Sequence, residues 1–168
     1  MRCYLDSSAL LKRAYTEPER AELVAFLSIM ASQGATFLTS ALSRVETKRS
    51  LRRAAANGQA DAERFEADYE AALKDIDIVA LSQQVLDEAE TIGDDSLRSL
   101  DAIHVATARL AGADMVVTYD NRMIRACFDA GVMTARPGIK EESLSPSWEW
   151  VTGDDPADVP EELWPAGW

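Results

Sequence analysis

The strongest constraint on the fold of this chain is an alternation of short apolar runs with longer helical patterns. Each apolar run is bounded by polar or turn-forming residues, as buried strands are. Helices lie between the runs, and helical crossovers connect neighbouring parallel strands. The pattern predicts an α/β fold with three layers, α/β/α, around a central, mainly parallel sheet of about five strands. The expected strands are residues 2–5, 35–39, 75–81, 115–118 and 132–135.

The expected helices are marked by apolar faces and by capping residues. In residues 19–32, apolar side chains recur at i, i+3, i+4 and i+7, which is the spacing of one buried helix face. They are Leu23, Phe26, Leu27 and Met30. Serines precede several of the helical patterns and are expected to cap them: Ser7 or Ser8, Ser40, and Ser82. Helices are expected at residues 8–15, 19–32, 40–56, 59–74, 82–92, 98–111 and 121–130.

The chain divides into one compact domain and an unusual tail. A length of 168 residues is enough for a single domain with a sizeable core. We place its end at residue 138, after Arg136-Pro137-Gly138. Residues 139–168 hold four of the six prolines, all four tryptophans and most of the excess negative charge. An acidic, proline-rich composition resembles a disordered tail, but the tryptophans favour packing on the domain or on a second copy.

Composition excludes several classes of protein. A net charge of −12 argues against a generic nucleic-acid coat. No apolar run approaches the roughly 20 residues of a membrane helix, and no secretory signal is visible, so we expect a cytoplasmic protein without a membrane partner. Cys3 and Cys127 have no metal-ligand spacing and are expected to be buried, small apolar residues.

Four acidic residues carry the main functional signal: Asp6, Glu46, Asp101 and Asp120. Three lie where an expected strand ends or an expected helix begins, and Glu46 lies in the helix after a strand. The carboxyl ends of parallel strands share one edge of the sheet, where ligand sites gather. Carboxylates that meet there repel one another unless cations join them. The arrangement therefore predicts a site for a hard divalent metal, and at least one raised carboxyl pKa in its absence.

Each acid also has an ordinary structural explanation. Asp6 and Asp120 are suitable helix N-caps, Asp101 is one more charge on an acidic surface, and Glu46 lies near basic residues with which it can pair. Only their joint placement favours a site. Around Glu46 we expect Ala41, Leu42 and Val45 to form the buried stripe of the helix. Thr118 is suited to fixing a carboxylate or a water on a metal.

The segments around these acids resemble those of the PIN-domain ribonucleases, and in particular the VapC-type toxins of bacterial toxin–antitoxin pairs. The four segments, in the family's order, are YLDSSALLK, SALSRVE, SLDAIHVATA and VTYDNRM. The resemblance covers residues 2–135. Residues 1–138 are therefore expected to be a PIN-like nuclease domain, and the tail after residue 138 lies outside the pattern.

The resemblance implies an endoribonuclease that depends on one or two Mg²⁺ or Mn²⁺ ions, with Asp6, Glu46, Asp101 and Asp120 as metal ligands. Ser7 and Thr118 are expected to support them. Hydrolysis would use water activated by the metal. The implied partners are RNA, a cognate antitoxin and a second copy of the chain. A basic cluster in the helix at 40–56 is expected to contact RNA or the antitoxin. Its members are Arg44, Lys48, Arg49, Arg52 and Arg53.

Several alternatives stay open or are disfavoured. A catalytically silent PIN-like module, acting through RNA or protein contacts, has the same acidic residues. A phosphatase with an aspartate nucleophile needs a second acid two residues after the first, where this chain has Ser8. A phosphoacceptor receiver domain needs paired acids after its first strand. His104 is more simply a packed or hydrogen-bonded helix residue than a general base.

Overall fold

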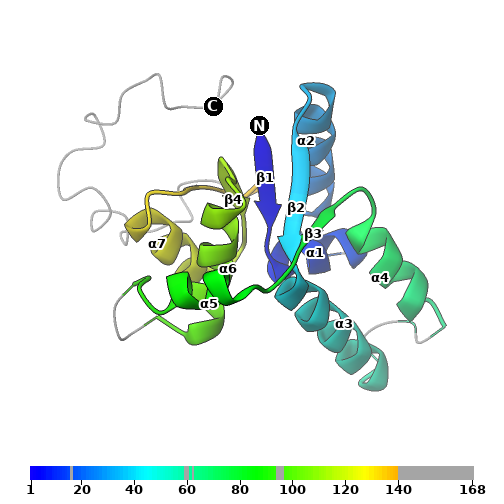
Figure 1. Cartoon of the computed structure of the whole chain (residues 1–168). Helices are drawn as coiled ribbons and strands as arrows, with labels where there is room; N and C mark the ends of the chain where they lie inside the picture. The colour runs from blue at the N-terminus through cyan, green and yellow to red at the C-terminus, as the bar shows by residue number, and fades with distance from the viewer. Residues whose placement is uncertain (16, 59–60, 62, 94–96, 140–168) are drawn as a thin grey trace. The chain divides into compact units, whose positions relative to one another are not determined.

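The structure is a computed structural model. It describes residues 1–139, apart from residues 16, 59–60, 62 and 94–96. The expectations for the tail fall on residues beyond that range. The described strands are β1 (Arg2–Leu5), β2 (Thr36–Ser40), β3 (Asp77–Val79), β4 (Met115–Val117) and β5 (Met133–Ala135). They form one five-stranded sheet in the order β3-β2-β1-β4-β5. Every pairing in it is parallel, so the predicted α/β class is confirmed (Figure 1).

Seven helices are described. They are α1 (Ser7–Ala14), α2 (Arg20–Ser32), α3 (Ala41–Ala56), α4 (Phe65–Leu73), α5 (Gln83–Ala89), α6 (Ser99–Leu110) and α7 (Asn121–Asp129). In Figure 1, α5, α6 and α7 lie on one side of the sheet, and α1 and α2 lie on the other. The helix α3 leaves the carboxyl end of β2 and packs beside α1 and α4.

The alternation of side chains along the central strands produces two cores. Tyr4 of β1 and Val116 of β4 point to one face, where they pack with residues of α5, α6 and α7. Cys3 and Leu5 point to the other face, toward α1 and α2. Both faces are apolar because helices cover both. Burial is confirmed for Cys3 and Cys127, whose thiols are free.

The capping pattern of the sequence is largely confirmed. The side chains of Ser40 and Ser82 accept from the backbone N–H groups of Ser43 and Val85. The first helix is different, because its N-cap is Asp6 rather than a serine. One carboxylate oxygen can accept two N–H groups at once, and here Asp6 accepts those of Ser8 and Ala9.

Several boundaries were predicted too generously. The helix expected at 59–74 begins at Phe65, because the side chain of Asp61 accepts from Glu63 N and forms a turn there. The strand expected at 75–81 contains only Asp77–Val79, since Asp75 has a left-handed backbone with φ of 60°. The helix expected to reach residue 92 ends at Ala89.

The predicted buried stripe of α3 was wrong. Ala41 and Leu42 are only partly buried, and Val45 is 55% exposed. The buried residues are Ser43, Thr47 and Leu51. Polar residues can be buried when hydrogen bonds replace water, and Ser43 lies within hydrogen-bonding distance of Ser40 and Tyr4. Apolar periodicity alone does not reveal such a face.

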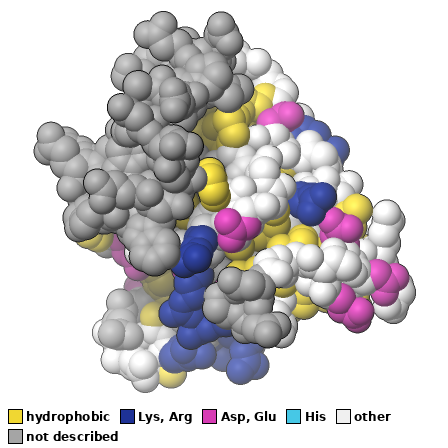
Figure 2. Space-filling model, turned by 90° about the vertical axis from the view of Figure 1, so that its left-hand side faces the viewer, with side chains coloured by type: hydrophobic (Ala, Val, Ile, Leu, Met, Phe, Trp, Pro, Cys, Tyr) yellow, Lys and Arg dark blue, Asp and Glu magenta, His cyan; other side chains and the backbone are white. Residues whose placement is uncertain are grey.

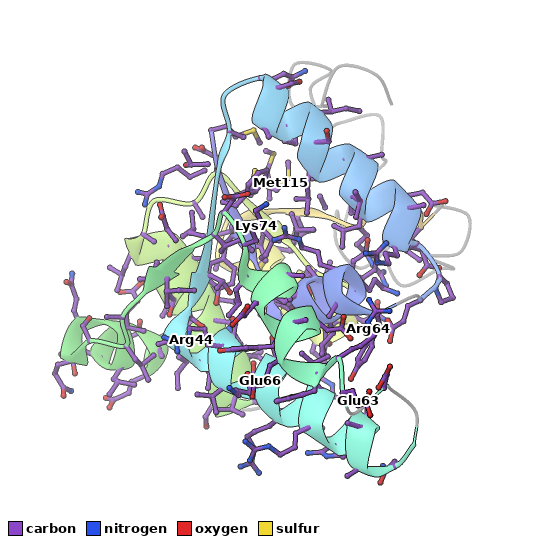
Figure 3. All side chains as sticks on the ribbon, turned by 90° about the vertical axis from the view of Figure 1, so that its right-hand side faces the viewer. Arg44, Glu63, Arg64, Glu66, Lys74 and Met115 are labelled. Atoms are coloured by element: carbon purple, nitrogen blue, oxygen red, sulfur yellow. The ribbon has the colours of Figure 1, made fainter. Side chains whose placement is uncertain are left out.

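The opposite side of α3 carries the basic cluster, which is mostly exposed. Arg44, Arg49, Arg52 and Arg53 are exposed or nearly so, whereas Lys48 is partly buried. Lys48 Nζ lies 3.1 Å from Glu66 Oε2 and 4.7 Å from the centre of the Tyr69 ring. Figure 3 shows α3 and α4 side by side, with Arg44 near the start of α3 and Glu66 between the two helices. Lys48 therefore contacts α4 and is not free on the surface of α3.

None of the helices in the described ranges is long and apolar enough to cross a membrane.

The two faces of α2 provide a test of the packing. Leu23 is fully buried and the next residue, Val24, is 43% exposed. Leu23→Ala leaves a cavity and is expected to lower the free energy of unfolding by about 2–5 kcal/mol. The matched change Val24→Ala is expected to change it by no more than about 0.5 kcal/mol. Urea unfolding followed by circular dichroism measures both, and equal losses would contradict the assigned face.

Candidate active site

Asp6 and Asp120 lie at the carboxyl edge of the sheet, where the direction of chain winding reverses. From β1 the chain winds outward through β2 to β3, then returns to β4 on the other side of β1. The adjacent ends of β1 and β4 are the switch point at which ligands bind in doubly wound sheets. Asp6 follows β1, and Thr118 and Asp120 follow β4. A backbone bond from Asp6 N to Val117 O joins the two ends.

Asp6 is a buried carboxylate held from several directions. Its side chain is almost fully buried. Oδ1 accepts from Ser8 Oγ at 2.6 Å, Ser8 N at 2.7 Å and Ala9 N at 3.1 Å. Oδ2 accepts from Thr118 Oγ1 at 2.7 Å. Burial raises the pKa of the Asp6 carboxyl above its ordinary value, although the bonds from Ser8, Thr118 and Ala9 act in the opposite direction.

Thr118 and Ser8 connect Asp6 to the loop after β4. Thr118 donates to Asp6 and also accepts from Asp120 N at 3.1 Å, so it fixes a carboxylate, as its position suggested. Ser8 donates to Asp6 and accepts from Tyr119 N at 2.8 Å. Sequence reasoning selected Ser7 and missed the role of Ser8. The N-cap position of Asp6 was the available signal, because a capping carboxylate faces the residue two positions on.

Glu46 is held by the single histidine of the chain. His104 Nε2 lies 2.8 Å from Glu46 Oε2, and His104 Nδ1 lies 2.7 Å from the hydroxyl of Tyr4. Burial acts to raise the pKa of Glu46, but His104 and the hydroxyl of Ser7 outweigh it, so the pKa lies below its ordinary value. His104 is thus a hydrogen-bonded helix residue. Ser7 supports Glu46 rather than Asp6.

Asp101 and Asp120 form the third part of the site. Burial, and then the charge of Asp120, raises the pKa of Asp101, while the positive side chains of Arg98 and Arg122 act in the opposite direction. Asp101 Oδ2 is buried and has no hydrogen-bond partner in the described part of the chain. Asp120 caps α7 by accepting from Arg122 N. Asp120 is therefore both the N-cap of α7 and a charged neighbour of Asp101.

The four acids share one region, but they do not form a closed cluster. His104 is within electrostatic reach of Asp6, Glu46 and Asp101, and Asp120 is within reach of Asp101. Among the described residues, no three Asp, Glu, His or Cys side chains come together closely enough to hold one ion. The oxygen ligands and the unpartnered oxygen of Asp101 nevertheless suit a hard divalent ion.

Comparison with known proteins gives the family. The PIN domain family model matches residues 3–129. The chain belongs to the PIN-domain family. A relative named Ribonuclease VapC47, from Mycobacterium tuberculosis, is 41% identical to this PIN protein over 137 residues, which is 80% of this chain and 96% of the relative.

Solved structures of low sequence identity share the fold of this PIN domain. VapC20 of Mycobacterium tuberculosis, described as a sarcin-ricin loop cleaving toxin, has a TM-score of 0.60 at 16% identity, over 80% of this chain and 99% of that one. VapBC2 of Rickettsia felis, solved with a DNA fragment from its promoter, has a TM-score of 0.57 at 14% identity, over 80% and 98% of the two chains.

Basic residues near the acids of this PIN domain are more numerous than the sequence suggested. Figure 2 shows a band of Lys and Arg side chains on the side of α5 and α7. Arg98 precedes α6 and Arg122 is in the first turn of α7, and both are exposed. Both affect Asp101. They were missed because they are not clustered in the sequence.

The raised pKa of Asp101 predicts a pH-dependent stability. Its ionised form is disfavoured in the folded protein, so this charge destabilises the fold at neutral pH. In EDTA, Asp101→Asn is expected to raise the thermal unfolding temperature at neutral pH. The gain is expected to fade as pH falls through the raised pKa toward the ordinary value of about 3.9, because the wild-type carboxyl is then protonated too.

A matched control is Asp129→Asn, which changes an exposed carboxylate at the end of α7. It is expected to leave the unfolding temperature nearly unchanged at both pH values. A stabilisation by Asp101→Asn that grows in acid would contradict the assignment.

Proposed function

We propose that this PIN protein is an endoribonuclease that depends on a divalent metal and acts as the toxin of a toxin–antitoxin pair. The observation that carries the proposal is that Asp6 and Asp120 follow the adjacent strands β1 and β4 in a chain 41% identical to a named ribonuclease. Asp6, Glu46, Asp101 and Asp120 are the proposed catalytic and metal-ligating residues. One or two ions of Mg²⁺ or Mn²⁺ are the proposed cofactor.

Asp6 and Asp101 have distinct parts in the proposed site. Asp6 is held rigidly by Ser8 and Thr118, so it offers an oxygen in a fixed position. The unpartnered Oδ2 of Asp101 is a natural ligand position, because a cation there replaces the missing hydrogen bond. A bound divalent ion supplies water activation and stabilises charge that develops on the phosphodiester. Arg98 and Arg122 are placed to attract the phosphate backbone.

The proposal also covers the organisation of the chain and its partners. Residues 1–138 are the nuclease domain and residues 139–168 are an extension, in agreement with a family match that ends at residue 129. The expected partners are RNA, an antitoxin and a second copy of the chain. The similarity to VapBC2 supports an antitoxin. A cytoplasmic location follows from a cellular RNA substrate.

A catalytically silent PIN module remains the second candidate. The absence of a closed three-ligand cluster among the described residues is the observation that favours it. Such a protein binds RNA or a partner but does not cleave.

Metal-dependent cleavage separates the two candidates. Purified protein with Mn²⁺ is expected to cleave a pool of cellular RNA, and EDTA is expected to stop the reaction. Asp6→Asn and Asp101→Asn are each expected to reduce cleavage below detection, because each removes a charged ligand. Asp129→Asn is the matched control and is expected to keep full activity. Equal activity in the Asp101→Asn and control variants would reject the catalytic role of this site.

The basic cluster of α3 gives a separate prediction about RNA binding. Arg49 and Arg52 are exposed, whereas Lys48 is engaged with α4. In protein made inactive by Asp101→Asn, replacing both arginines with alanine is expected to weaken RNA binding. The slope of log affinity against log salt is expected to decrease by about 0.7 for each phosphate that the protein no longer neutralises.

Fluorescence anisotropy with labelled RNA at several salt concentrations measures this slope. Arg2→Ala is the control, because Arg2 is exposed at the amino end of β1, opposite to the site. An unchanged slope after removal of both arginines would place the RNA elsewhere.

A further inference from the structure

A buried chain of hydrogen bonds connects the first strand to one acid of the site. It runs from the hydroxyl of Tyr4 in β1, through both ring nitrogens of His104 in α6, to Glu46 in α3. Tyr4 is fully buried, and His104 is 4% exposed. Each member comes from a different element. The chain therefore ties the carboxylate to the centre of the sheet.

The direction of these hydrogen bonds follows from the chemistry of the two end groups, the Glu46 carboxylate and the Tyr4 hydroxyl. A carboxylate only accepts hydrogen bonds, so Nε2 donates to Glu46. Burial raises the pKa of the Tyr4 hydroxyl, which therefore keeps its proton. In the neutral ring Nδ1 has a free lone pair and accepts from that hydroxyl. The Glu46 carboxylate thus favours the tautomer of His104 with the proton on Nε2, and the Tyr4 hydroxyl supports this tautomer by donating to Nδ1.

Two serine hydroxyls also lie near Nδ1, at longer distances than that of Tyr4. Ser43 Oγ lies 3.4 Å and Ser40 Oγ lies 3.5 Å from Nδ1. A serine hydroxyl can donate or accept, so neither serine alone fixes which nitrogen carries the proton. The Tyr4 hydroxyl is nearer, at 2.7 Å, and it donates to Nδ1 when Nε2 carries the proton shared with Glu46.

We infer that Tyr4 and His104 are positioning residues that orient the Glu46 carboxylate for a divalent cation. The inference rests on the proposed function. His104 acts through Glu46 and does not itself touch the RNA. Any buried histidine needs a polar partner at each nitrogen, so the identity of the Nε2 partner, the proposed metal ligand Glu46, is what carries the inference. Removing a group that orients a ligand typically lowers metal affinity by about 10- to 100-fold.

Two substitutions of His104 test its hydrogen bonds to Glu46 and to Tyr4 separately. Glutamine places an amide near the position of Nε2, so His104→Gln keeps a donor for Glu46. Asparagine reaches only as far as Nδ1, so His104→Asn keeps a partner for Tyr4 and loses the bond to Glu46. Tyr4→Phe removes only the hydroxyl. Val105→Ala is the control for packing, because Val105 is fully buried in the same helix and in the same core.

Mn²⁺ affinity is measured by titration calorimetry on variants shown to be folded by circular dichroism. His104→Asn is expected to bind about 10-fold more weakly than wild type or worse. His104→Gln is expected to bind more tightly than His104→Asn, and Tyr4→Phe to lie between wild type and His104→Asn. Val105→Ala is expected to lose stability and keep its affinity. Equal affinities for the asparagine and glutamine variants, or a loss in Val105→Ala as large as theirs, would overturn the inference.

The tautomer of His104 is measured independently of metal and of cleavage. The chain has one histidine, so ¹⁵N NMR of labelled metal-free protein reports on this ring alone. A proton on Nε2 is expected in wild type, because Glu46 only accepts there. Tyr4→Phe is expected to lower the share of this tautomer, because Nδ1 loses its donor. A proton on Nδ1 in the neutral ring of wild type would overturn the inference. If wild type neither binds Mn²⁺ nor cleaves RNA, the proposed function fails, and this NMR result alone decides the orientation of the ring.

Discussion

The burial of the Asp6 carboxylate between β1 and β4 is the interaction on which the rest of the site depends. Removing a charge from water costs several kcal/mol unless hydrogen bonds replace the lost solvent. Here Ser8 and Ala9 supply donors from α1, and Thr118 supplies one from beyond β4. The same bonds that compensate the charge also start α1 and join the two central strands. The Asp6 carboxylate therefore both stabilises the fold and belongs to the proposed site.

The pKa values of the acids near Asp6 are shifted in different directions by their surroundings. Burial acts to raise the pKa of Glu46, but the hydrogen bond from His104 outweighs it and the pKa is lowered. Asp101 lies near Asp120 and keeps one oxygen without a partner, and its pKa is raised. The expectation that at least one pKa would be raised is confirmed, although burial contributes more than repulsion between the acids. A site with unsatisfied negative charge is poised to take up a cation.

The order of the elements could be predicted because it depends on local patterns. Apolar runs in β1 and β4 and serine caps at Ser40 and Ser82 use interactions within a few residues. The inner face of α3 could not be predicted. Ser43 is buried there through contacts with Tyr4 and Ser40, and Tyr4 is distant in the chain. Apolar periodicity does not register a buried polar face, so Val45 was expected inside and is exposed.

The sequence by itself determined the α/β class, because strand and helix periods are local properties of the chain. Four short segments that resemble those of the PIN domains indicated the family and suggested the four acids as a site. Only the tertiary structure decided which groups meet those acids. Ser8 with Asp6, His104 between Tyr4 and Glu46, and Arg98 and Arg122 around Asp101 are brought together by the packing of separate elements on the sheet. The physical reason is that hydrogen bonds and charges act over a few ångströms in space, whatever the separation in sequence.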